Sequence, residues 1–304
     1  MAAITAQLIK KLRDLTGAGM MDCKKALVST DGDFDKAIDV LRERGLSKAE
    51  KKADRIAAEG LVRIAFSDDH KQAAIAEVNI ETDFAAKNAE FIEFVEGVSQ
   101  KALDNDFADL ESFMALPFGA DGTVQETLVA KIAKIGEKIS VRRVQKLATP
   151  GVVYTGYIHG GGRIGVIVGI KTDASFDEVA TVGKDFAMQV ASMNPHFVND
   201  DEADPNWIAH EKEIARQQLL NEGKKPELIE KIIPGKIKAV LKEACLVEQK
   251  FVKNSDITVG EYVADAAKAL GKDMKVVEMV RYEVGEGIEK KQENFAEEVA
   301  AQLK

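Results

Sequence analysis

The sequence predicts an α+β fold in which a small helical bundle precedes a core made of two similar halves. Within the first 45 residues, apolar side chains recur at three- and four-residue spacing, which is typical of short amphipathic helices. After residue 60, two pairs of strand-like runs are each followed by helical patterns and by a later strand. A chain of 304 residues is also long enough to bury more than one core. We therefore expect several domains, with a repeated α+β unit at the centre.

The composition narrows the class of partner. The 51 acidic residues outnumber the 42 basic ones, so the net negative charge of the chain disfavours binding to nucleic acid or to an anionic membrane. Cys23 and Cys245 stand far apart and outside any Cys-x-x-Cys pattern, which suits a reducing compartment and argues against a structural metal site. No apolar run approaches the roughly 18 residues that span a bilayer, and a helical pattern begins at once after Met1. We expect a cytoplasmic protein that binds a protein or a small molecule, without a cofactor.

Residues 1–45 form the predicted bundle. Its first helix shows one apolar face and stops at residues 16–19, and a second short helix covers residues 21–28. A third helix starts after Asp31-Gly32-Asp33 and is expected to end at Gly45. Three such helices enclose little core, and a module of this kind usually serves for docking.

The repeated core is expected in residues 60–149, and in residues 150–195 together with 249–285. Each half begins with a hairpin, continues with helices and ends with a strand. The expected strands are residues 61–66, 73–80, 139–147, 152–158, 164–171 and 276–284, and helices are expected to begin near Ala89, Phe107, Thr123, Asp173 and Thr258. The two halves share a turn, which reads Thr82-Asp83-Phe84 in the first and Thr172-Asp173-Ala174-Ser175-Phe176 in the second. The second turn has no aromatic directly after the acid, which favours a special role for the first.

Three further segments complete the domain plan. Residues 46–59, rich in Lys, Ala and Glu, are interpreted as a solvated helical linker. Residues 196–248 are interpreted as a helical hairpin inserted into the second half, with a kink or break expected near Ile233 because Pro234 removes a backbone donor. Residues 286–304 are expected to form a C-terminal helical module.

The corner after the strand at residues 73–80 carries an unusual choice of residues, an acid followed by a large aromatic. In one interpretation Asp83 caps the next helix and Phe84 folds back into its own core, as most aromatics do. In the other, Phe84 is held outward and offers about 1.5–3 kcal/mol of burial to a partner's pocket, while Asp83 offers a charge. The spacing of the residues leaves both interpretations open.

A glycine motif suggests a different function. Gly160-x-Gly162-x-x-Gly165 formally matches the dinucleotide-binding fingerprint, which requires a helix after the glycines so that helix amides meet a pyrophosphate. Residues 164–170 have the pattern of a strand instead, so the glycines are interpreted as a hairpin turn. His159 at the tip of this turn has an ordinary explanation as a solvated or hydrogen-bonded side chain.

The bundle carries the clearest family signature. Residues 12–27, LRDLTGAGMMDCKKAL, resemble the N-terminal signature of the bacterial elongation factor Ts family, and Thr82-Asp83-Phe84 stands at the expected place downstream. The resemblance runs from about residue 5 to residue 303, with Ala85 where the family commonly has valine. Members of this family are guanine-nucleotide exchange factors of the translational GTPase elongation factor Tu. The resemblance thus implies a fold similar to ubiquitin-associated (UBA) domains for the bundle, a protruding helical hairpin, and no enzymatic chemistry.

The resemblance also implies which residues meet the GTPase. Phe84 would wedge between helices of its nucleotide-binding domain, while Asp83 would disturb the magnesium site beside it. The other implied contacts are Arg13, Met20, Met21, Lys52, Thr82, Ile135, Gly136 and His159, with the C-terminal module as a further contact. Considered without the resemblance, the two methionines fill the core or form an adaptable surface, and Gly136 ends a helix. Two other functions stay open: a nucleotide-binding enzyme that uses residues 160–165, and a non-catalytic scaffold that binds proteins through the bundle.

Overall fold

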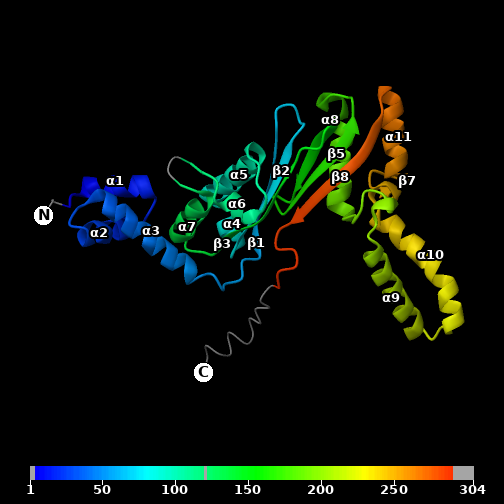
Figure 1. Ribbon diagram of the computed structural model, residues 1–304, viewed down its shortest axis with the longest axis horizontal. Helices are drawn as coiled ribbons and strands as arrows, with labels where there is room; N and C mark the ends of the chain where they lie inside the picture. The colour runs from blue at the N-terminus through cyan, green and yellow to red at the C-terminus, as the bar shows by residue number, and fades with distance from the viewer. Residues whose placement is uncertain (1–3, 120–121, 290–304) are drawn as a thin grey trace. The chain divides into compact units, whose positions relative to one another are not determined.

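The computed structural model describes residues 4–119 and 122–289, and most of its helices and strands are labelled in Figure 1. The chain divides into two compact units. Unit 1 comprises Met1–Arg63, Ala76–Gln145 and Glu283–Lys304, and unit 2 comprises Ile64–Ile75 and Lys146–Tyr282. Helices accompany two three-stranded sheets, one with strand order β1-β2-β3 and the other with order β4-β5-β8. In both, the third strand pairs with the second strand of a hairpin. The predicted α+β class is confirmed.

The N-terminal bundle consists of α1 (Ala6–Thr16), α2 (Met20–Ser29) and α3 (Phe34–Glu50). The side chain of Thr5 caps α1 by accepting from the backbone N–H of Leu8, and Gly17 ends the helix with a φ of 65°. Asp33 caps α3 in the same way. The three helices enclose a small buried core: Ile9, Leu12, Cys23, Ala26, Leu27, Ala37 and Leu41.

The third helix is longer than the sequence predicted. Gly45 lies inside α3, which continues to Glu50, and residues 51–58 then follow as turns and extended chain. The prediction that Gly45 ends the helix is therefore wrong, and the predicted helical linker of residues 46–59 is helical only as far as Glu50. Gly45 faces α7, and a Cβ atom built on it would lie 3.5 Å from a methyl group of Val129 and 3.8 Å from the Cβ of Ala133.

This geometry predicts that Gly45→Ala stabilises unit 1. Both distances are ordinary van der Waals contacts, and alanine gains about 1 kcal/mol over glycine inside a helix. We expect the free energy of unfolding to rise by about 1 kcal/mol, measured by urea denaturation followed by circular dichroism. Gly97→Ala in α5 is the matched control, because its added methyl would lie 2.8 Å from the Phe118 ring. Equal stabilisation by both variants would show that helix propensity alone governs the effect.

The first α+β half begins with the hairpin of β1 (Glu59–Phe66) and β2 (Ala73–Ile80). The end of this hairpin, residues 64–75, belongs to unit 2. The elements that follow are α4 (Asp83–Ala86), α5 (Ala89–Asp104), α6 (Leu110–Met114), α7 (Val124–Ile135) and β3 (Ile139–Leu147). Every residue of β2 is buried, including Glu77. This carboxylate receives hydrogen bonds from Arg142 (3.1 Å), Arg143 (2.6 Å) and the backbone N–H of Gly285 (2.9 Å), so its burial is compensated within unit 1.

The second half has β4 (Val152–His159) and β5 (Ile164–Thr172) as an antiparallel hairpin, in register from Val152 opposite Lys171 to His159 opposite Ile164. The long helix α8 (Phe176–Met193) packs on both strands, and α11 (Val259–Leu270) and β8 (Met274–Glu283) complete the half. A short ribbon of β6 (Lys250–Phe251) and β7 (Asn254–Thr258) was not predicted, because two residues are too few for a visible alternation.

The inserted hairpin consists of α9 (Pro205–Asn221) and α10 (Pro226–Ala244), which lie side by side in Figure 1 and follow a short 3₁₀ helix, η1 (Asp200–Glu202). A second 3₁₀ helix, η2 (Leu246–Glu248), follows α10. The sequence predicted a kink or a break near Ile233, and the structure shows no break, because α10 runs without interruption through Pro234. Ile229, Ile233 and Ile237 form a buried stripe against Leu219 of α9. Pro234 lies on the exposed face, where water can bond the carbonyl that loses its donor.

Both cysteines are free and buried. Burial raises the pKa of the Cys23 thiol, and burial together with nearby carboxylates raises that of Cys245 to about 11. The thiols therefore stay protonated at neutral pH. Among the described residues, no helix is long and apolar enough to cross a membrane, and no group of three or more His, Cys, Asp or Glu side chains is arranged to hold a metal ion. Most of the predicted C-terminal module, residues 290–304, lies outside the described part of the chain.

Candidate functional site

The corner between β2 and α5 is built from two consecutive helix caps. The Thr82 side chain accepts from the backbone N–H of Ala85 at 3.2 Å and begins the single turn of α4, and Asn88 then caps α5. Asp83 is the first residue of α4 and does not cap it. The interpretation of Asp83 as a helix cap is therefore wrong, since the residue before it has that role.

Phe84 points into solvent. Its side chain is 81% exposed, the highest value among the large apolar side chains that the structure describes as exposed. The interpretation that Phe84 folds back into its own core is therefore wrong. In the second half, Phe176 shows the contrast: its ring stacks on His70 with centroids 3.4 Å apart and packs against the core of unit 2. The two turns share a sequence pattern, and only the first presents its aromatic.

Lys87 links the two exposed residues of the corner. Its ammonium group lies 2.8 Å from the carboxylate of Asp83 and 5.7 Å from the centroid of the Phe84 ring. The hydrogen bond from Lys87 holds the pKa of the Asp83 carboxyl below its ordinary value, so Asp83 is ionised at neutral pH. The corner therefore presents a ring and a negative charge side by side.

The end of α7 lies against this corner. Gly136 ends the helix with a φ of 87°, and the chain turns so that the Glu137 carboxylate accepts from the backbone N–H of Thr82 at 3.0 Å and from its hydroxyl at 2.8 Å. In the other direction, Glu81 accepts from the backbone N–H of Lys138 at 2.5 Å. The structure thus brings Ile135-Gly136 next to Thr82-Asp83-Phe84, although more than 50 residues separate the two segments.

The candidate contacts of the bundle lie on its surface. Met20 and Met21 are both exposed at the start of α2, so the interpretation of them as core-filling residues is wrong. Arg13 is exposed in the last turn of α1, and Lys52 is half-buried in the turn after α3. Leu15 is a further exposed apolar residue close to the methionines in sequence. Paired methionines at a surface can adapt to the shape of a partner.

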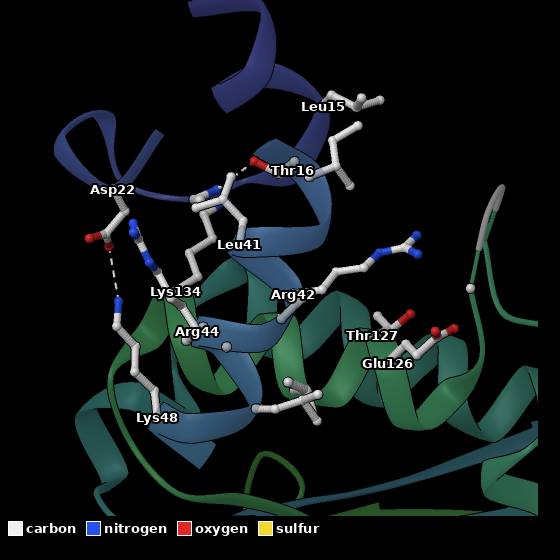
Figure 2. A pocket seen from close by; sticks show the side chains of 18 of the residues that line it. Leu15, Thr16, Asp22, Leu41, Arg42, Arg44, Lys48, Glu126, Thr127 and Lys134 are labelled. Atoms are coloured by element: carbon white, nitrogen blue, oxygen red, sulfur yellow. Dashed lines mark hydrogen bonds and ion pairs between the residues drawn. The ribbon is translucent and has the colours of Figure 1, made fainter. Parts of the chain in front are cut away.

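A cavity of about 730 Å³ lies between the bundle and α7 within unit 1 (Figure 2). At its edge, Lys48 of α3 pairs with Asp22 of α2 at 2.9 Å, and this hydrogen bond lowers the pKa of the Asp22 carboxyl. Lys134 of α7 pairs with Glu90 of α5. None of the ten candidate contacts lines this cavity. They lie on exposed or half-exposed surface, unlike the concave site that small molecules usually occupy.

His159 is the one candidate contact in unit 2. It is exposed at the end of β4, with its Nδ1 atom 3.1 Å from the hydroxyl of Tyr157. The next three residues, Gly160, Gly161 and Gly162, all have positive φ angles and turn the chain directly into β5. Because a strand follows, the turn presents no helix N-terminus to a pyrophosphate.

Comparison with known proteins decides the classification. The family model described as "Elongation factor TS" matches residues 81–286, more than half of the chain. The chain belongs to the elongation factor Ts family. The Elongation factor Ts of Clostridioides difficile (strain 630) is 56% identical to it over 304 residues, which cover 100% of both chains. The Elongation factor Ts of Nautilia profundicola is 51% identical over 308 residues and 100% of both chains. That of Clostridium botulinum (strain Alaska E43 / Type E3) is 49% identical over 300 residues and 99% of both chains.

Membership of the elongation factor Ts family places the protein among the factors of translation elongation. The matched segment begins at Glu81, so it contains the exposed corner and extends past Gly136 and His159. The bundle precedes the matched segment and is covered by the full-length relatives.

Sequence reasoning missed three residues of the corner. Lys87 stands four residues after Asp83 on a helical turn, and this spacing is itself the signal of an ion pair. Glu81 and Glu137 gave no such signal, because each bonds a backbone group more than 50 positions away. Only the folded chain shows that these two glutamates support the candidate site.

Proposed function

We propose that this protein promotes the release of GDP from elongation factor Tu, acting as a binding partner without covalent chemistry of its own. The observation that carries the proposal is the exposed ring of Phe84 on the turn of α4, whose N-cap Thr82 is hydrogen-bonded to Glu137. An aromatic side chain in this state stores binding energy that burial in a partner would release.

In the proposed mechanism the ring of Phe84 enters a pocket between helices of the GTPase domain, and Asp83 comes close to its magnesium site. Asp83 carries a full negative charge for this task. Mg²⁺ demands a near-ideal shell of oxygen ligands, so a carboxylate brought beside that shell can rearrange it. Lys87 must release Asp83 when the corner docks, because in the free protein its ammonium group pairs with the acid and lies 5.7 Å from the centroid of the ring.

Several contact surfaces must together supply the free energy that lowers the barrier to GDP release. An acceleration of about a thousand-fold requires about 4 kcal/mol off the barrier, whereas burying Phe84 supplies about 1.5–3 kcal/mol. We propose that Arg13, Met20, Met21 and Lys52 dock the bundle, that Thr82, Ile135 and Gly136 extend the contact around Phe84, and that His159 adds a contact from unit 2. In this plan residues 1–45 are the docking module and residues 60–149 carry the wedge. The site of action is the cytoplasm, where elongation takes place.

Thermodynamic linkage gives the proposal a second consequence. If the factor lowers the affinity of the GTPase for GDP, then GDP lowers the affinity of the GTPase for the factor by the same ratio. The complex should therefore be most stable when the nucleotide site is empty.

The test is a nucleotide-release assay. Elongation factor Tu is loaded with a fluorescent GDP analogue and mixed with excess unlabelled GDP, with and without this protein. We expect the release rate to rise with the concentration of the protein and to reach a plateau about a thousand-fold above the spontaneous rate, the effect that about 4 kcal/mol produces. A rate that is unchanged at every concentration would contradict the proposal. Titrating the isolated protein with ATP, GTP and NAD tests the enzyme alternative, for which saturable binding is required.

A further inference from the structure

The corner that carries Phe84 is held by a pair of crossed interactions between two chain segments of unit 1. Glu137 bonds the backbone N–H and the hydroxyl of Thr82, and Glu81 bonds the backbone N–H of Lys138. We call these four residues the crossed clamp. Each segment contributes one carboxylate and receives one, so neither can shift along the other without breaking bonds in both directions.

Within the crossed clamp, Glu137 controls the orientation of α4. The Thr82 hydroxyl donates to Glu137 and at the same time accepts from the backbone N–H of Ala85, which begins the helix. Since α4 has only four residues, it cannot hold its own direction and depends on its cap. Phe84 is the second residue of this turn. A change at Glu137 therefore reaches the ring through the side chain of Thr82.

The clamp is also tied to the segment that follows α3. The ammonium group of Lys138 donates to the backbone carbonyls of Ala53 and Arg55 at 2.6 and 2.8 Å, and the Arg55 guanidinium lies 3.3 Å from the Glu81 carboxylate. These bonds connect the crossed clamp to a third chain segment, residues 53–55. The half-buried position of Glu137 limits competition from water.

We propose that Glu137 is a positioning residue for nucleotide exchange: through Thr82 it holds the turn of α4 at the angle that presents Phe84 to the GTPase. This inference rests on the proposed function, since it assigns a residue to the same wedge. Glu137 acts on the rate of GDP release by limiting the directions that the ring samples before docking. Most of its contribution should be lost when the ring is absent, and the remainder acts through Asp83 and Thr82.

The second half of the core supplies a matched control. There Glu178 accepts from the backbone N–H of Ser175 at 2.8 Å and from its hydroxyl at 2.9 Å, so it makes the same pair of bonds to a helix cap. The aromatic beside that cap, Phe176, is partly buried and packs against the core of unit 2. Glu178→Ala thus removes an equivalent pair of bonds, together with an ion pair to Lys272 at 2.8 Å, at a corner whose aromatic is packed against its own unit.

The experiment is a double-mutant cycle in the GDP-release assay with elongation factor Tu, using Glu137→Ala, Phe84→Ala and the double variant. Losing the two bonds should lower the plateau rate about three- to ten-fold, with little change in the concentration that gives half the plateau. In the Phe84→Ala background the same substitution should have a clearly smaller effect, because only Asp83 and Thr82 then remain to be positioned. Glu137→Gln should recover part of the rate, because its amide oxygen still accepts from Thr82, and Glu178→Ala should leave the rate unchanged.

The outcomes separate this inference from the proposed function. If the unmodified protein accelerates release and Glu137→Ala slows it equally with and without Phe84, the positioning role is overturned and the exchange function stands. The same holds if Glu137→Ala leaves the plateau unchanged. Failure of the unmodified protein to accelerate release overturns both. Far-ultraviolet circular dichroism of each variant shows whether it is folded, and Glu137→Gln provides the readout if the alanine variant is not.

Discussion

Replacing Phe84 with alanine is expected to slow stimulated GDP release about ten- to a hundred-fold, the rate equivalent of the 1.5–3 kcal/mol that burial of the ring supplies. Because the side chain is 81% exposed, its removal leaves no cavity in the free protein. The variant should therefore unfold at the same denaturant concentration as the unmodified protein. The measurement is the plateau rate of release of a fluorescent GDP analogue from elongation factor Tu, with urea denaturation alongside.

Leu228→Ala is the control for Phe84→Ala. Leu228 is another exposed large apolar residue, located in the first turn of α10 and assigned no role in the wedge. It should leave the release rate unchanged, which would show that lost surface hydrophobicity alone is not the cause. If elongation factor Tu released GDP as fast with Phe84→Ala as with the unmodified protein, insertion of the Phe84 ring would not be part of the mechanism.

The second large effect is expected at Glu77, and it concerns stability. Replacing it with glutamine removes the charge that two arginines and a backbone N–H share at a fully buried position in β2. Removing one partner of a buried ion pair typically costs 3–5 kcal/mol, and the partial exposure of both arginines reduces this to about 2–3 kcal/mol. We expect the loss in urea denaturation, with faster hydrogen exchange in β2 and β3.

Glu111→Gln in α6 makes the same chemical change at an exposed position of unit 1 and should alter the free energy of unfolding by less than about 0.5 kcal/mol. A similar small effect at Glu77 would mean that the arginines find equivalent partners in water. In that case the buried network would contribute specificity of the fold instead of stability.

Local pattern predicted much of the secondary structure. The spacing of Phe91, Phe94, Val95 and Val98 predicted α5, and the structure buries those residues. The glycines after His159 predicted a hairpin, which the register of β4 and β5 confirms. These predictions succeeded because helix and strand periods are set by the backbone itself and are visible over a few residues.

Predictions of helix ends from a single glycine or proline failed where packing between elements stabilised the helix more than that residue destabilised it. Gly45 was expected to end α3, but close packing against α7 keeps the helix intact beyond it. Pro234 was expected to kink or break α10, but the helix continues through it, and the buried isoleucine stripe packs against α9. In both cases a local cost of about 1–3 kcal/mol is smaller than the burial gained along the whole helix.

The order of residues was enough to place an acid and an aromatic at a corner between a strand and a helix, and to show the signature of the elongation factor Ts family. The folded chain was needed to show that Phe84 faces solvent while Phe176 stacks on His70, and that Glu137 bonds Thr82 from a distant segment. The physical reason is that exposure depends on which other elements pack over a side chain. Spacing along the chain does not contain that information.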